Sequence, residues 1–105
     1  MTHSDAVKMV RGKTNRDTRK VGNNTYAEIL VDGSVGIVLH GTTVVKIHPD
    51  NSATLNSGGW HTSTTKDRMN KYSPVQVRQR KGRWYLNGDT PYEDGVVVAD
   101  MNLIY

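Results

Sequence analysis

Four short runs of β-branched and aromatic residues, separated by turn-forming residues, limit this chain to a mainly antiparallel sheet between residues 26 and 56. The runs cover residues 26–31, 35–40, 43–48 and 53–56, and the sequences between them are Asp-Gly-Ser, Gly-Thr and Pro-Asp-Asn-Ser. Gly and Asn tolerate positive φ, and Pro presets a turn. The spacing therefore predicts an antiparallel meander.

Alternation within these runs assigns their faces. Val35, Ile37 and Leu39 fall on one side of their strand, and Val38 and His40 fall on the other. Because successive side chains of a strand point to opposite faces, we expect one face of the meander to pack in the hydrophobic core and the other to be partly exposed to solvent.

The remaining elements complete an α+β fold. Residues 63–71 are the one helix candidate, opened by a hydroxyl that can cap it and anchored by Met69 and Tyr72. A hairpin is expected over residues 75–80 and 83–87, and a last strand over 96–99 that leads into residues 102–105. We predict a mostly antiparallel β-sheet, a meander plus a C-terminal hairpin, with one short helix and a disordered basic N-terminal arm.

The 105 residues fit a flexible basic arm, residues 1–20, followed by a single compact domain, residues 21–105. The formal charge of +4 lies entirely in the arm, which has six basic residues against Asp5 and Asp17, whereas the rest has eight of each sign. The arm is either a solvated tail or a nucleic-acid contact that neutralises phosphates. Its candidate nucleic-acid-binding residues are Lys8, Arg11, Lys13, Arg16, Arg19 and Lys20.

Composition excludes several classes of protein. Apolar residues are 35% of the chain and Phe is absent, so the core is thin and a homo-oligomer would strengthen it. The lack of Cys excludes disulfide and thiolate chemistry. No stretch resembles a signal peptide or approaches the roughly 20 apolar residues of a membrane span, so we expect a cytoplasmic protein without a membrane partner.

The stretch LNSGGWHTSTTKDRMN, residues 55–70, carries the first candidate site. Glycine amides and a helix N-terminus can hold an anion, a tryptophan can stack on a base, and cations follow in the helix. We predict a site for a phosphate-bearing ligand, nucleic acid or a nucleotide, at Gly58, Gly59, Trp60, His61, Lys66 and Arg68. The alternative is a structural corner in which the glycines make the turn and Trp60 fills the core.

The C-terminal hairpin carries the second candidate. If Lys81-Gly82 is its turn, Arg78 faces Tyr85 and Arg80 faces Arg83, which places three arginines and a tyrosine on one side. Opposed arginines are unfavourable without an anion, so Arg78, Arg80 and Arg83 are predicted to contact nucleic acid. The alternative is a solvent-facing edge neutralised by the acidic loop with Asp89, Glu93 and Asp94.

The histidines His40, His48 and His61 have no recognised metal-ligand spacing, so we expect neither a metal site nor a cofactor. One of them could serve a ribonuclease as acid or base, with Lys66 and Arg68 stabilising the phosphorane. No nucleophile or carboxylate pair supports that reading, and a non-enzymatic protein is preferred.

Three segments, GNNTYAEI, VGIVLHGTTVVKIHPDNSATLNSGGWHTSTTKDRMN and RWYLNGDTPYEDGVVV, resemble a widespread family of small, uncharacterised bacteriophage proteins. The resemblance spans about residues 19–98, and its most distinctive part is LNSGGW followed by TTKDRMN. Thr62-Ser63 and the loop over residues 87–94 depart from the family pattern. The resemblance implies a phage protein in the cytoplasm of the infected bacterial host, and it transfers no catalytic residues.

These observations favour a non-enzymatic phage accessory protein that binds nucleic acid or a nucleotide signal of host defence, in a counter-defence role. A module that inhibits a host bacterial protein is the alternative, and a small ribonuclease is the third hypothesis.

Overall fold

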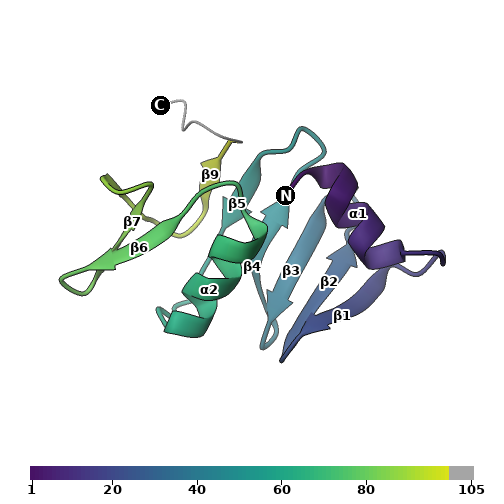
Figure 1. The fold of residues 1–105 in the computed structure, drawn as a ribbon, viewed down its shortest axis with the longest axis horizontal. Helices are drawn as coiled ribbons and strands as arrows, with labels where there is room; N and C mark the ends of the chain where they lie inside the picture. The colour runs from purple at the N-terminus through teal and green to yellow at the C-terminus, as the bar shows by residue number, and fades with distance from the viewer. Residues whose placement is uncertain (100–105) are drawn as a thin grey trace.

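The computed structural model describes residues 1–99, and these form an α+β fold with two antiparallel sheets. The larger sheet has the strand order β1-β2-β3-β4-β5-β9, the smaller one β6-β7-β8. Helices α1 and α2 lie across the same face of the larger sheet (Figure 1). The elements are α1 (His3–Arg11), β1 (Thr18–Gly22), β2 (Thr25–Ile29), β3 (Val35–Leu39), β4 (Thr42–Ile47), β5 (Ala53–Leu55), α2 (Ser63–Tyr72), β6 (Val77–Arg80), β7 (Arg83–Leu86), β8 (Thr90–Pro91) and β9 (Val96–Val98).

The mostly antiparallel fold class predicted from the sequence is confirmed, and so are the meander strands. Val35, Ile37 and Leu39 are buried on the face that the helices cover, as their alternation predicts. One irregularity was not predicted: β4 pairs Val45 with Ile37 but Thr43 with Val38, so the strand bulges and Val44 also turns inward. Val44 thereby becomes available to line the candidate site.

The expectation of a disordered basic arm over residues 1–20 is wrong, as is that of a single helix. Residues 3–11 form α1, whose N-cap Thr2 accepts a hydrogen bond from the Asp5 amide. Ala6 and Val10, one turn apart, are fully buried against the sheet. Residues 18–22 then pair with β2 as an edge strand. The six cations of this segment are exposed, and they lie on α1, on β1 and in the loop between them.

The β6–β7 hairpin projects beyond the main sheet (Figure 1), with the predicted register. Arg78 lies opposite Tyr85, and Arg80 lies opposite Arg83. Lys81 and Gly82 both have positive φ, 53° and 78°, as a two-residue type I′ turn requires. The closing segment expected over residues 102–105 lies outside the described residues. None of the helices in residues 1–99 is long and apolar enough to cross a membrane.

Candidate functional site

A tight turn connects β5 to α2 and positions Trp60. Gly58 and Gly59 have φ values of 64° and 87°, which side-chain-bearing residues rarely adopt. Thr62 is the N-cap of α2, and its hydroxyl accepts a hydrogen bond from the Thr65 amide at 3.2 Å. Two glycines and a capping threonine therefore fix the path between the strand and the helix.

The side-chain carboxylate of Asp94, far along the sequence from the turn, holds it in place. Asp94 accepts hydrogen bonds from the amide and the hydroxyl of buried Ser57, at 2.9 and 3.0 Å, and from the Tyr92 hydroxyl at 2.6 Å. Burial acts to raise the pKa of Asp94, but these hydrogen bonds outweigh it and hold that pKa below its ordinary value. Burial and the neighbouring Asp94 carboxylate raise the pKa of Tyr92 well above its ordinary value. Asp94 is thus a structural partner of the turn rather than a counter-ion of the arginine hairpin.

The glycine amides have internal acceptors. The Gly58 amide donates to the Asn56 side chain at 2.8 Å, and the Gly59 amide donates to the Ser57 hydroxyl at 3.1 Å. A phosphate would have to displace both side chains to use these donors. The sequence-based expectation that the two amides point freely at an anion does not match this geometry.

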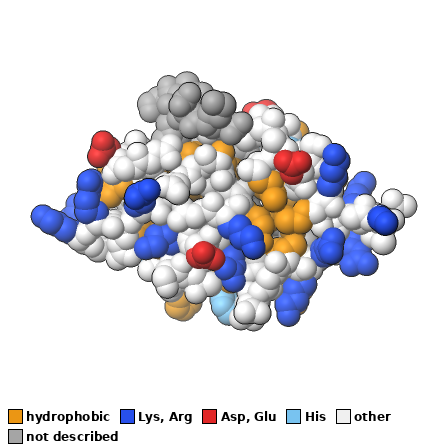
Figure 2. All heavy atoms as spheres, in the orientation of Figure 1, with side chains coloured by type: hydrophobic (Ala, Val, Ile, Leu, Met, Phe, Trp, Pro, Cys, Tyr) orange, Lys and Arg blue, Asp and Glu red, His pale blue; other side chains and the backbone are white. Residues whose placement is uncertain are grey.

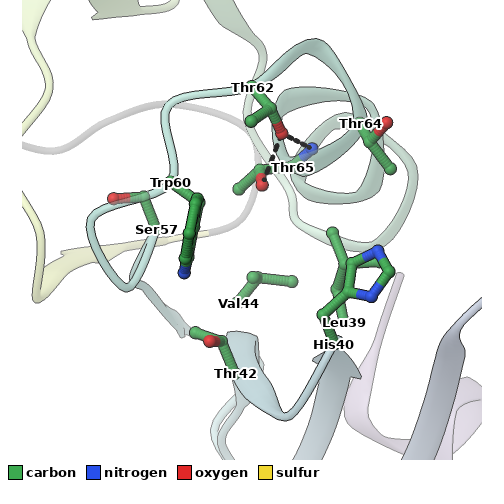
Figure 3. Close-up of a pocket in the computed structure, with 9 residues that line it drawn as sticks. All are labelled: Leu39, His40, Thr42, Val44, Ser57, Trp60, Thr62, Thr64 and Thr65. Carbon is green, nitrogen blue, oxygen red and sulfur yellow. Dashed lines mark hydrogen bonds between the residues drawn. The ribbon is translucent and has the colours of Figure 1, made fainter.

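Trp60 does not fill the core, because 67% of it is exposed. Its ring forms one wall of a groove of about 400 Å³, and Leu39 and His40 form the opposite wall, with Val44 between them (Figure 3). We name this cavity the Trp60 groove. Its other lining residues all carry hydroxyl groups; they are Thr42, Ser57, Thr62, Thr64 and Thr65.

The Trp60 groove combines an aromatic face and an apolar floor with several hydroxyls, and no Lys, Arg, Asp or Glu among residues 1–99 lines it. Hydroxyl groups both donate and accept hydrogen bonds, so they can match a neutral polar edge of either kind. The groove is therefore suited to a flat, uncharged ring such as a nucleobase, and not to a phosphate group.

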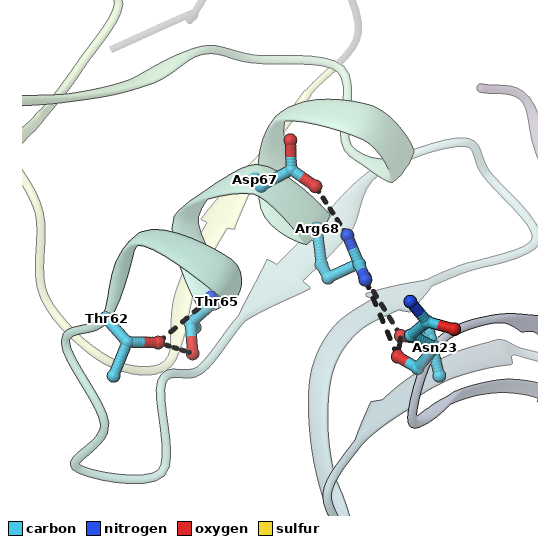
Figure 4. Close-up of polar contacts among 6 residues, drawn as sticks. Asn23, Thr62, Thr65, Asp67 and Arg68 are labelled. Carbon is cyan, nitrogen blue, oxygen red and sulfur yellow. Dashed lines mark hydrogen bonds and ion pairs between the residues drawn. The ribbon is translucent and has the colours of Figure 1, made fainter.

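Lys66 and Arg68 leave the groove in different directions. The Lys66 ammonium donates to the Gln79 side chain in β6 at 3.1 Å. The Arg68 guanidinium instead reaches the β1–β2 turn, where it donates to the Thr25 hydroxyl at 2.9 Å and the Asn23 carbonyl at 3.5 Å (Figure 4). Arg68 thus ties α2 to the sheet, and neither residue lines the Trp60 groove.

The histidines have three different environments. His61 turns toward the hairpin, where its ring packs edge-on against Trp84 at a centroid distance of 4.7 Å. His48 lies within hydrogen-bonding distance of Ser34 and Thr54, at 3.3 and 2.7 Å. His40 lies in the groove wall. Within residues 1–99, no three His, Asp or Glu side chains gather as a metal site.

The arginines of the hairpin form an exposed ribbon, which we call the arginine ribbon: Arg78, Arg80 and Arg83. The Arg80 guanidinium stacks 4.5 Å from the centre of the Tyr85 ring and lies 3.9 Å from Asp89, which is itself 97% exposed. Solvent screens such a pair strongly, so the acidic loop neutralises little of this charge. The six cations of residues 8–20 are also exposed, and Lys and Arg side chains are spread across the visible face (Figure 2).

Sequence reasoning missed much of the groove. Of the six residues predicted for the first site, Trp60 lines it; the threonines of the helix cap and the bulged Val44 were not anticipated as ligand-facing. The run of hydroxyl residues after Trp60 is the sequence signal for this lining, since it supplies polar groups beyond those that a helix cap needs.

Comparison with known proteins gives one family. The family model described as Kyanoviridae Gp96 protein matches residues 3–99, nearly the whole chain. No curated protein and no solved structure matches the chain.

Proposed function

Because the chain belongs to the Kyanoviridae Gp96 family, a phage protein family, we propose that it is a small non-enzymatic accessory protein that binds single-stranded nucleic acid in the cytoplasm of the infected host. The observation that carries this proposal is the exposed Trp60 ring beside an apolar-floored groove. Exposed aromatic rings are the platforms on which unpaired bases stack.

The groove would take a base. Stacking on one aromatic side chain contributes about 1–3 kcal/mol per base, and it tolerates any base because every base has a flat face. The hydroxyls of Thr42 and Thr64 supply donors and acceptors for the edge of the base.

Phosphates would be held elsewhere, by the arginine ribbon and by the exposed Lys8, Arg11 and Arg16. Arg80 and Arg83 lie directly opposite each other, an unfavourable pair that an intervening phosphate would relieve. The cations are therefore separate from the groove. A nucleic-acid strand that extends beyond the groove can reach them, whereas the phosphates of a small nucleotide would lie within the groove, whose lining, over the described residues, includes no cation.

Intrinsic fluorescence provides the test, because the chain has two tryptophans and Trp84 is only 5% exposed. Adding oligothymidylate should quench Trp60 emission, and log affinity should fall linearly with log salt. Trp60→Leu should remove the quench and weaken binding roughly 5- to 150-fold, the equivalent of about 1–3 kcal/mol. Tyr26→Leu is the matched control, because Tyr26 is an exposed aromatic that alternates with buried Ala27 and so lies on the other face of the sheet.

Absence of binding by the wild-type protein at low salt would overturn the proposal. Equal losses in Trp60→Leu and Tyr26→Leu would exclude the groove as the base site. Cleavage of an added oligouridylate, whose 2′-hydroxyl supplies the nucleophile that thymidylate lacks, would instead favour the ribonuclease if it disappears in His40→Ala.

A further inference from the structure

A second hollow lies between α1, β1 and the C-terminal end of α2, away from the Trp60 groove. Its volume is about 420 Å³, and its apolar lining residues are Met1, Met9, Val21 and Tyr72. Figure 2 shows hydrophobic side chains in view between the two helices, with Lys and Arg side chains and also an acidic side chain beside them. We name this hollow the basic cleft.

The apolar part of the basic cleft is only partly covered by the chain itself. Tyr72 forms a buried floor, Met9 and Val21 are half-buried, and Met1 is 39% exposed. Methionine side chains are flexible and polarisable, and they recur on surfaces that adapt to bound peptides. The lining therefore has the character of a docking surface for aliphatic anchors.

The charged part of the lining has a single sign. Arg19, Lys20 and Lys71 line the cleft, and no Asp or Glu of the part of the chain that the structure describes does so. Within residues 1–99 the ion pairs involve Arg11, Lys46, Arg68 and Arg80, so none of the three cleft cations has a carboxylate partner.

The positions of two cations are fixed by other contacts. The Arg19 guanidinium donates to the Met9 carbonyl at 3.2 Å, at the C-terminal end of α1, and the Lys71 ammonium lies 5.4 Å from the centre of the Tyr72 ring. The two cations thus come from different elements and border the same apolar floor.

We propose that the basic cleft binds an acidic segment of a partner protein, anchored by aliphatic side chains between its carboxylates. Charge complementarity argues for an acidic occupant, and the methionine and valine lining argues for aliphatic anchors. A nucleic acid fits this surface less well, because its one aromatic ring, Tyr72, is 2% exposed and offers no free face to a base. The inference is independent of base binding in the Trp60 groove.

The test follows methionine methyl signals by NMR while a synthetic peptide of alternating glutamate and leucine character is added. The Met9 methyl signal should shift and saturate, and the signal of fully buried Met69 should stay in place and report that the fold is intact. A peptide with glutamine in place of glutamate, and one with serine in place of leucine, should each bind much more weakly.

Two charge reversals locate the site. Lys20→Glu and Lys71→Glu should each weaken the peptide roughly fivefold, as expected when a surface attraction is replaced by a repulsion. Lys13→Glu is the matched control, because it makes the same change of charge at an exposed position outside the cleft lining, and it should leave affinity within about twofold.

Three outcomes would overturn the proposal. One is a Met9 signal that does not move at millimolar peptide. Another is an equal loss of affinity in Lys13→Glu and the two cleft variants, which would indicate attraction to net charge alone. The third is equal binding of the glutamine peptide.

Discussion

The two glycines of the Gly-Gly-Trp turn should respond very differently to the same substitution. Both have positive φ, so Gly58→Ala and Gly59→Ala each place a Cβ atom in a left-handed backbone. A Cβ at Gly59 would meet no atom within 4 Å, whereas one at Gly58 would lie 2.6 Å from Thr42 Cγ2 and 2.9 Å from Thr42 Oγ1. Strain in the backbone is common to both variants, and a steric clash is added at Gly58.

The clash cannot be relieved by rotating Thr42. Its Cβ carries two heavy atoms in three staggered positions, and two of those positions face Gly58. Every rotamer therefore leaves at least one heavy atom against the new Cβ. Left-handed backbone costs a residue with a side chain about 1–2 kcal/mol, and overpacking adds about 1–3 kcal/mol. Gly58→Ala should lower the free energy of unfolding by about 2–5 kcal/mol, and Gly59→Ala by about 1–2 kcal/mol.

Chemical denaturation of the two variants and of Thr42→Ala/Gly58→Ala measures both contributions. The double variant removes Cγ2 and Oγ1, so it should recover the steric part and retain the strain, with a coupling free energy of about 1–3 kcal/mol. Equal destabilisation by the two single variants, within about 0.5 kcal/mol, would refute the steric argument. So would a double variant no more stable than additivity predicts.

Three further predictions concern the helix, the turn and the ribbon. Val10→Asp should lower the free energy of unfolding by about 3 kcal/mol or more, because it buries an unpaired carboxylate. Ser4→Asp, at an exposed position in the first turn of α1, should change it by less than about 0.5 kcal/mol. Equal, small effects of the two substitutions would mean that α1 does not pack against the sheet. Asp94→Asn should lower the free energy of unfolding by about 1 kcal/mol, which is less than the about 1.5–3 kcal/mol typical of hydrogen bonds to charged groups because solvent screens this exposed carboxylate. Since the pKa of Asp94 is lowered by folding, this advantage of the wild type is present above pH 4 and should vanish as the pH falls through that lowered pKa, which thermal melts across pH 2 to 6 can follow. Arg83→Thr should raise the melting temperature slightly by relieving the pair with Arg80, and should reduce the salt slope of nucleic-acid binding by about 0.7–0.9; a lower melting temperature with an unchanged slope would contradict the ribbon.

The strands and their faces could be predicted because period-two alternation and turn chemistry are local properties. The hairpin register followed from one such feature, the Lys81-Gly82 turn, since a two-residue loop fixes every cross-strand pair behind it. The groove depended on non-local facts. Asp94 fastens Ser57 across 37 residues of sequence, and no local pattern announces that contact.

Two errors had signals that were available in the sequence. Ala6 and Val10 lie at helical spacing in residues 1–20, and this short apolar stripe indicates a packed helix despite the density of charge around it. Lys66 and Arg68 are two positions apart, and residues at that spacing on a helix point in different directions, so they could not both have faced one ligand. The structure shows this divergence, with Lys66 at β6 and Arg68 at the β1–β2 turn.

The Trp60 groove and the basic cleft lie at opposite ends of α2. Two ligands bound in them at the same time would therefore affect each other's affinity through electrostatic repulsion. Thr65 lines the groove and Tyr72 lines the cleft, and seven residues of helix separate them by about 10 Å. Occupants need not touch at that distance, but it is close to the Debye length of about 10 Å at 0.1 M salt, so a nucleic acid and an acidic segment would still repel each other. Oligothymidylate should therefore weaken the glutamate–leucine peptide at low salt, and the effect should fade as salt is raised, in titrations that follow the Met9 methyl signal. Competition that stays complete at high salt would show instead that both ligands occupy one site.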